Sequence, residues 1–93
     1  MEQKNEKMQA MYQLIASLDS AEDCRKLLAD LCTIKELEKM AERIYAAQLL
    51  LEGKTYNQVM EKADISSATL SRVSRCVQYG EGYSTFLKQK EVR

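Results

Sequence analysis

The side chains best suited to recognising a ligand fall between positions 66 and 75 of this chain. We assign these residues of that run to a DNA interface: Ser66, Ser67, Ala68, Thr69, Ser71, Arg72 and Arg75. A helix that enters the major groove needs small polar groups at its tip and cationic groups beside the phosphates. We expect the small residues to approach base edges, Thr69 to lie at the boundary with the backbone, and the two arginines to contact phosphate or guanine.

Two short helices joined by a tight turn, over residues 55–79, would hold this run in place. Thr55 and Gln58 have the spacing of a capping box, and the helix that they begin should end near Ala63. Asp64 tolerates the left-handed backbone conformation that the turn requires, and Ile65 would fill the angle between the helices. The pattern predicts a helix-turn-helix that binds double-stranded DNA.

The second helix of this pair would begin after Ser66, its N-terminal cap. Leu70, Val73 and Val77 recur at spacings of three and four, so they share an inward face. An ordinary helical hairpin has the same caps and the same apolar stripe. The order of small hydroxyl residues followed by arginine favours the DNA reader. One alternative stays open, a helical dimerisation or protein-binding module that never touches DNA.

The composition predicts a single all-α domain over residues 1–93. The chain has 3 glycines and no proline, and nearly every segment shows helical periodicity. No apolar run is long enough to cross a membrane, and the charged N-terminal segment lacks the apolar core of a signal peptide. We therefore expect a cytoplasmic protein without a membrane partner.

Charge is balanced over the chain but not along it. Residues 1–52 hold 7 basic and 10 acidic residues, whereas residues 53–93 hold 7 basic and 4 acidic ones. An acidic body with a mildly basic C-terminal part suits a DNA reader. The 3 cysteines form no CxxC pair, histidine is absent, and no nucleophile is placed beside a base. We expect no enzyme activity, no metal site and no cofactor.

Residues 1–52 would form dimerisation helices ahead of the reader. We expect one helix at Asn5–Leu18, a second after a Ser20 cap, and a third at Ile34–Glu52 that ends at Gly53 as a left-handed cap. The residues that we place on their inward faces are Met8, Met11, Tyr12, Ile15, Leu18, Cys24, Leu27, Leu28, Leu31, Leu37, Met40, Ile44, Ala47 and Leu51. A short final helix and tail would occupy residues 83–93.

A chain this small has little interior to share among six helices. The apolar stripes of the first two helices are wide, and only Asp19 and Ser20 join those helices. We therefore expect a homodimer in which the N-terminal helices pack against a second copy. The alternative is that the stripes meet inside one bundle. Two reading helices about 34 Å apart would match a near-palindromic operator.

Three stretches between about residues 27 and 78 resemble the tryptophan repressor family. They are LLADLCT before the third helix, AAQLLLEG at its end, and SATLSRVS in the reader. The resemblance implies a six-helix fold, an intertwined homodimer and the function of a transcriptional repressor. Within the family, the chain looks most like short bacterial members of unassigned effector.

The resemblance also implies an effector pocket between the reading helix and the long helix. The matching residues are Thr33, Arg43, Arg72, Val73 and Cys76, with the two arginines stacked about an indole ring. Val73 stands where the repressor has glycine, and Cys76 stands where it has a serine that engages the ligand's amino group. The added methyl groups and the lost hydrogen bond each cost about 1–3 kcal/mol, which together weaken binding by about 10²–10⁴-fold. Tryptophan is therefore not the expected effector. Alternatively, the arginines pair with nearby acids or with DNA phosphate.

Overall fold

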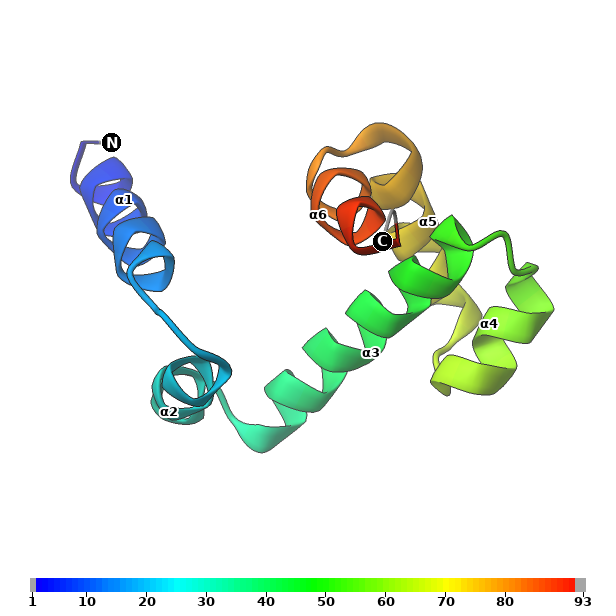
Figure 1. The fold of residues 1–93 in the computed structure, drawn as a ribbon, viewed down its shortest axis with the longest axis horizontal. Coiled ribbons are helices and arrows are strands. Elements are labelled where there is room, and N and C mark those ends of the chain that lie inside the picture. The colour runs from blue at the N-terminus through cyan, green and yellow to red at the C-terminus, as the bar shows by residue number, and fades with distance from the viewer. Residues whose placement is uncertain (1, 92–93) are drawn as a thin grey trace. The chain divides into compact units, whose positions relative to one another are not determined.

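The computed structural model describes the backbone of residues 2–91 and the side chains of residues 5–87. Six helices follow one another along this part of the chain (Figure 1): α1 (Glu2–Ala16), α2 (Ala21–Leu31), α3 (Ile34–Leu51), α4 (Tyr56–Ala63), α5 (Ser67–Tyr79) and α6 (Gly82–Glu91). The predicted all-α class is confirmed. The chain divides into two compact units, Met1–Ile34 and Lys35–Arg93. No helix in the described part is long and apolar enough to cross a membrane.

In the first unit, α1 begins earlier and ends earlier than the predicted Asn5–Leu18. The chain leaves the helix after Ala16, where the Ser17 hydroxyl donates a hydrogen bond to the carbonyl oxygen of Leu14 at 2.7 Å. The predicted inward face of α1 is not buried. Four of its predicted members, Met8, Met11, Tyr12 and Ile15, are 37–50% exposed, and Leu18 is half-buried.

The second helix of this unit, α2, begins at the predicted cap. The Ser20 hydroxyl accepts a hydrogen bond from the Asp23 backbone amide at 3.0 Å. One turn along, Arg25 binds both carboxylate oxygens of Glu22, at 3.1 and 2.6 Å. These hydrogen bonds lower the pKa of the Glu22 carboxyl and raise the pKa of the Arg25 guanidinium. No side chain of α2 is buried within the described part of the chain.

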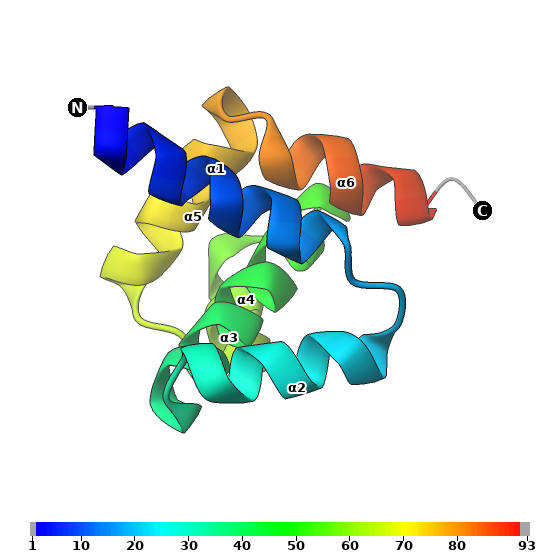
Figure 2. The same ribbon diagram turned by 90° about the vertical axis from the view of Figure 1, so that its left-hand side faces the viewer.

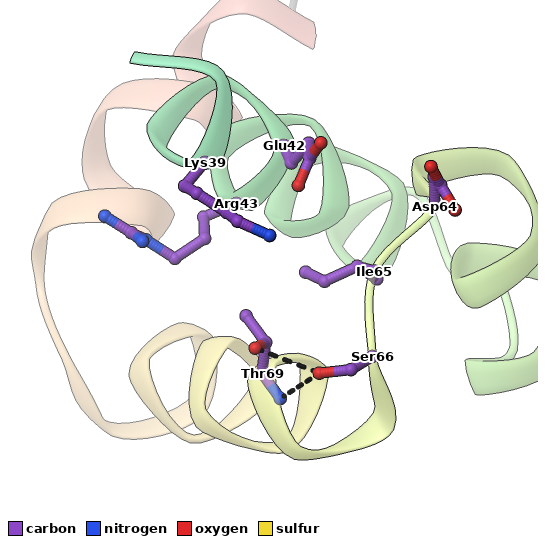
Figure 3. Close-up of a pocket in the computed structure, with 7 residues that line it drawn as sticks. All are labelled: Lys39, Glu42, Arg43, Asp64, Ile65, Ser66 and Thr69. Carbon is purple, nitrogen blue, oxygen red and sulfur yellow. Dashed lines mark hydrogen bonds between the residues drawn. The ribbon is translucent and has the colours of Figure 1, made fainter. Parts of the chain in front are cut away.

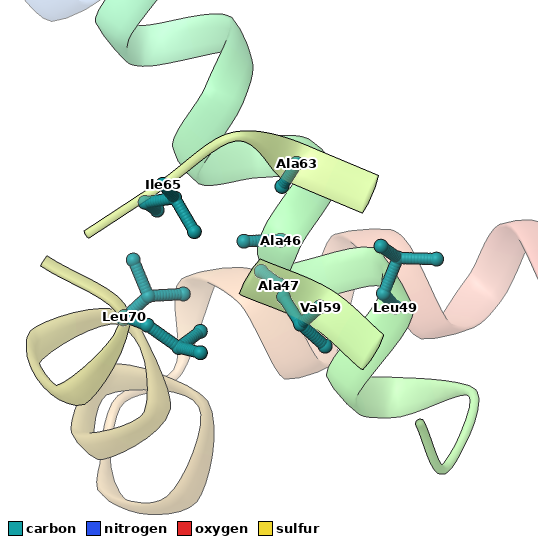
Figure 4. Packing of buried hydrophobic residues seen from close by; sticks show 8 residues of the cluster. Ala46, Ala47, Leu49, Val59, Ala63, Ile65 and Leu70 are labelled. Carbon is teal, nitrogen blue, oxygen red and sulfur yellow. The ribbon is translucent and has the colours of Figure 1, made fainter. Parts of the chain in front are cut away.

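The second unit has a continuous apolar core. Its buried side chains come from α3, α4, the turn and α5: Ala46, Ala47, Leu49, Val59, Ala63, Ile65, Leu70 and Val73. Figure 4 shows the two α3 alanines between the residues of α4 and those of the turn and α5. Because alanine has only a methyl group, α4 and α5 can approach the α3 backbone closely.

The face that α3 buries differs from the predicted stripe. Ala47 is buried as expected, but Ile44 is 47% exposed, and Ala46 and Leu49 are buried in its place. Leu37, Met40 and Leu51 are only half-buried. The apolar spacing predicted for α3 is therefore not what decides this core, because α4 and α5 cover the face that carries Ala46. The predicted left-handed cap at Gly53 is confirmed, with φ +94°.

The last helix, α6, turns back beside α5 (Figure 1 and Figure 2). Gly80 ends α5, and α6 begins at Gly82, one residue before the predicted start. Tyr83 and Leu87 of α6 are partly buried against the core. Of the short helix and tail predicted over residues 83–93, the chain is helical up to Glu91, and residues 92–93 lie outside the described part.

Candidate nucleic-acid interface

The turn between α4 and α5 has the predicted conformation. Thr55 and Gln58 form a reciprocal capping box at the start of α4, with hydrogen bonds of 2.9 and 3.2 Å. Asp64 ends α4 in the left-handed region, at φ 54° and ψ 51°. Ile65 follows with its side chain buried, and Ser66 then caps α5. These local signals fix the direction in which α5 leaves the turn.

At the start of α5, Ser66 and Thr69 bind each other. The Ser66 hydroxyl accepts a hydrogen bond from the Thr69 amide at 3.2 Å and donates one to the Thr69 hydroxyl at 3.1 Å. Thr69 is half-buried, and its predicted place at the boundary with the DNA backbone stays a prediction. The two hydroxyls thus have a structural role in shaping the helix tip, whatever they contact outside the chain.

The outer face of α5 carries the remaining residues of the predicted interface, which are Ser67, Ala68, Ser71, Arg72 and Arg75, all exposed. The opposite face of the same helix buries Leu70 and Val73 completely or nearly so. Among the described side chains, neither arginine has an ion pair or a side-chain hydrogen bond with the protein. The helix therefore presents small residues at its tip and uncompensated positive charge one to two turns further along.

A hollow of about 310 Å³ lies between α3, α5 and α6. It brings together four predicted pocket residues, Arg43, Arg72, Val73 and Cys76. Thr33, the fifth, precedes α3 outside the Lys35–Arg93 unit, and its place in the pocket stays a prediction. Val73 is only 1% exposed, so its isopropyl group belongs to the core and also forms the wall of the hollow.

Tyr83 also lines this hollow, although the sequence did not predict it there. Tyr83 reaches it from the first turn of α6, and the same residue and Cys76 also line a neighbouring apolar hollow of about 370 Å³ with Phe86. An aromatic residue just after the Gly80–Gly82 break was the available signal, because a helix that turns back there must place its first turn against α5.

A third, smaller hollow of about 150 Å³ lies between α3 and the turn (Figure 3). Its lining residues are Lys39, Glu42, Arg43, Asp64, Ile65, Ser66 and Thr69. The predicted interface residues Ser66 and Thr69 therefore have two cations of α3 as neighbours. Lys39 was missed from the sequence, because nothing in its local pattern relates α3 to the tip of α5.

Comparisons with known proteins agree with this architecture. The family model described as Trp repressor protein matches residues 6–91. A Bacillus subtilis (strain 168) protein named YerC, itself uncharacterized, is 38% identical over 77 residues, which are 83% of this chain and 74% of that protein.

Two solved structures have the same fold. A candidate Trp repressor from Staphylococcus aureus superposes with a TM-score of 0.86 at 29% identity, over 92% of this chain and 87% of that one. A TrpR like protein from Eubacterium eligens ATCC 27750 gives 0.87 at 32% identity, over 92% and 90%. The chain therefore belongs to the Trp repressor family, whose members are regulators rather than enzymes.

Proposed function

We propose that this protein is a cytoplasmic transcriptional repressor that binds a near-palindromic DNA operator as a homodimer. The observation that carries the proposal is the outer face of α5. It combines exposed small residues at the tip with Arg72 and Arg75, which have no ion pair among the described side chains. Membership of the Trp repressor family supports the same function.

The small residues and the arginines of this face have different roles in the proposal. Ser67, Ala68 and Ser71 are small enough for the α5 backbone to come close to base edges in the major groove. Arg72 and Arg75 follow on the same face, where they contact a phosphate or the O6 and N7 atoms of guanine. The hydrogen-bonded pair at the start of α5 holds the tip rigid, so the small side chains are already in place before binding.

The homodimer is supported by the exposed apolar side chains of α1. In isolation a 15-residue helix is marginal in water, and none of the described side chains of α1, those of residues 5–16, is buried. Burying a Met, Leu or Ile side chain contributes about 1.5–3 kcal/mol, so a partner that covers Met11 and Ile15 would stabilise α1 substantially. A second copy supplies such a partner and also a second reading helix.

A direct test of DNA binding uses duplexes of random sequence. The wild-type protein should bind this pool with an affinity that falls steeply with salt, because each phosphate contact releases counterions. Arg72→Glu should abolish the binding, whereas Lys26→Glu, the same change of charge on an exposed residue of α2, should reduce it only slightly. Equal binding by wild type and Arg72→Glu would contradict the role given to α5.

Arg75 allows base and phosphate contacts to be separated. If it binds guanine with two hydrogen bonds, Arg75→Ala should cost about 1–3 kcal/mol and relax one operator position. If it binds only phosphate, the loss should be the same for every duplex and the salt slope should fall by about one.

A further inference from the structure

Two cations of α3 lie beside the first turn of the reading helix. Lys39 and Arg43 are one helical turn apart, and both line the hollow that also contains Ser66 and Thr69 at the tip of α5 (Figure 3). In that view the Lys39 ammonium points toward the middle of the hollow, whereas the Asp64 carboxylate points away from it. The hollow therefore joins a cationic edge of α3 to the tip of the reader.

The charge on this edge is not neutralised within the protein. Neither Lys39 nor Arg43 forms an ion pair or a side-chain hydrogen bond with any described residue, although Glu42 and Asp64 line the same hollow. Figure 3 shows the two charged ends pointing in different directions from α3, and each leaves positive charge that an external anion would neutralise favourably. Lys39 is exposed and Arg43 is half-buried, so both can be reached from outside the described chain.

We propose that Lys39, together with Arg43, holds the DNA backbone at the edge of the groove that α5 enters. This inference rests on the DNA binding proposed above and adds a phosphate contact from outside the helix-turn-helix. A helix in the major groove is flanked by phosphates, and contacts to them fix its register without reading sequence. Because Lys39 comes from a different helix than Arg72 and Arg75, it would restrain the angle at which α5 enters the groove.

Glu42 limits the strength of this contact. Its carboxylate lines the same hollow as the two cations and would repel the phosphate. Removing that charge should therefore tighten DNA binding. An opposite effect of Lys39 and Glu42 substitutions on affinity is the signature of an electrostatic contact at this hollow, since loss of fold would weaken binding in both variants.

The test measures the affinity of duplexes for Lys39→Ala. Lys54→Ala, which removes the same charge from a half-buried lysine three residues beyond the end of α3, is the control. At 0.1 M salt, losing this phosphate contact should weaken binding about five- to tenfold and reduce the salt slope by about one for each reading helix, whatever the duplex sequence. Lys39→Arg should retain the affinity, and Glu42→Gln should raise it. Lys54→Ala should stay within about twofold of the wild type.

The outcomes separate this inference from the proposed function. If the wild type binds DNA and Lys39→Ala binds as Lys54→Ala does, the backbone contact is wrong and the DNA reader stands. A loss confined to some duplex sequences would also overturn the proposal, because a phosphate contact does not distinguish bases. If the wild type binds no duplex under any salt condition, the proposed function and this inference are both wrong.

Discussion

Replacing Ser67 with glutamate should make the protein more stable and, at the same time, a weaker DNA binder. Ser67 is the first residue of α5 and its side chain is exposed. An acid in the first turn interacts favourably with the helix dipole, which contributes about 0.3–1 kcal/mol to stability. The same carboxylate would lie near phosphates if α5 enters the groove. Like charges about 4 Å apart repel by about 1 kcal/mol in water and about 4 kcal/mol at a protein surface, so affinity should fall about 5- to 1,000-fold per reading helix.

Two measurements in one buffer separate these effects. Thermal unfolding followed by circular dichroism reports stability, and fluorescence anisotropy with a labelled duplex reports affinity. Gln78→Glu makes the same change of charge at an exposed position in the last turn of α5, about 16 Å away along the helix axis. There the acid opposes the dipole, so stability should fall slightly while DNA affinity changes little. A folded Ser67→Glu protein that binds DNA as tightly as the wild type would refute the reasoning.

Three further predictions concern the turn, a helix end and the effector. Asp64→Gly should raise the free energy of unfolding in urea by about 0.5–1 kcal/mol. Relief of the left-handed backbone strain at Asp64 should exceed the conformational entropy cost of glycine. Lower stability would show that the Asp64 side chain is needed. An added methyl group meets nothing within 4 Å at either Gly53 or Gly82, but only Gly53 has a positive φ. Gly53→Ala should therefore destabilise the protein by about 1–2 kcal/mol and Gly82→Ala should not; equal melting temperatures would contradict this. Added tryptophan should leave the duplex Kd unchanged, since Val73 and Cys76 wall the hollow; a tenfold tighter Kd would show that the indole is accommodated.

The helix-turn-helix could be predicted closely from the sequence because local interactions determine it. The Thr55 capping box, the left-handed Asp64 and the Ser66 cap each involve residues no more than three positions apart. The spacing of Leu70 and Val73 then decides which face of α5 is buried. Such signals need no knowledge of the rest of the fold.

The parts that the sequence did not predict depend on contacts between distant segments. Ile44 fits the apolar spacing of α3, yet the buried residue is Ala46, because the helix-turn-helix packs on that face and only a small side chain allows the close approach. Tyr83 of α6 lines the hollow that contains Val73, and Lys39 of α3 lines the hollow beside the turn. The local pattern around Lys39 gives no hint of this, and for Tyr83 the only signal is its place just after the Gly80–Gly82 break, since the direction in which each helix packs is set by the whole core.

In the proposed homodimer, α5 of each subunit binds one half of the DNA operator. The most direct test is selection of bound duplexes from a random pool at near-physiological salt, with Ser67→Glu and Gln78→Glu in parallel. We expect a two-fold-symmetric motif whose half-sites lie about one helical turn apart. The wild type and Gln78→Glu should both enrich it, and Ser67→Glu should lose it. A motif without symmetry would contradict the dimer, and a motif that Ser67→Glu still enriches would contradict the role of α5.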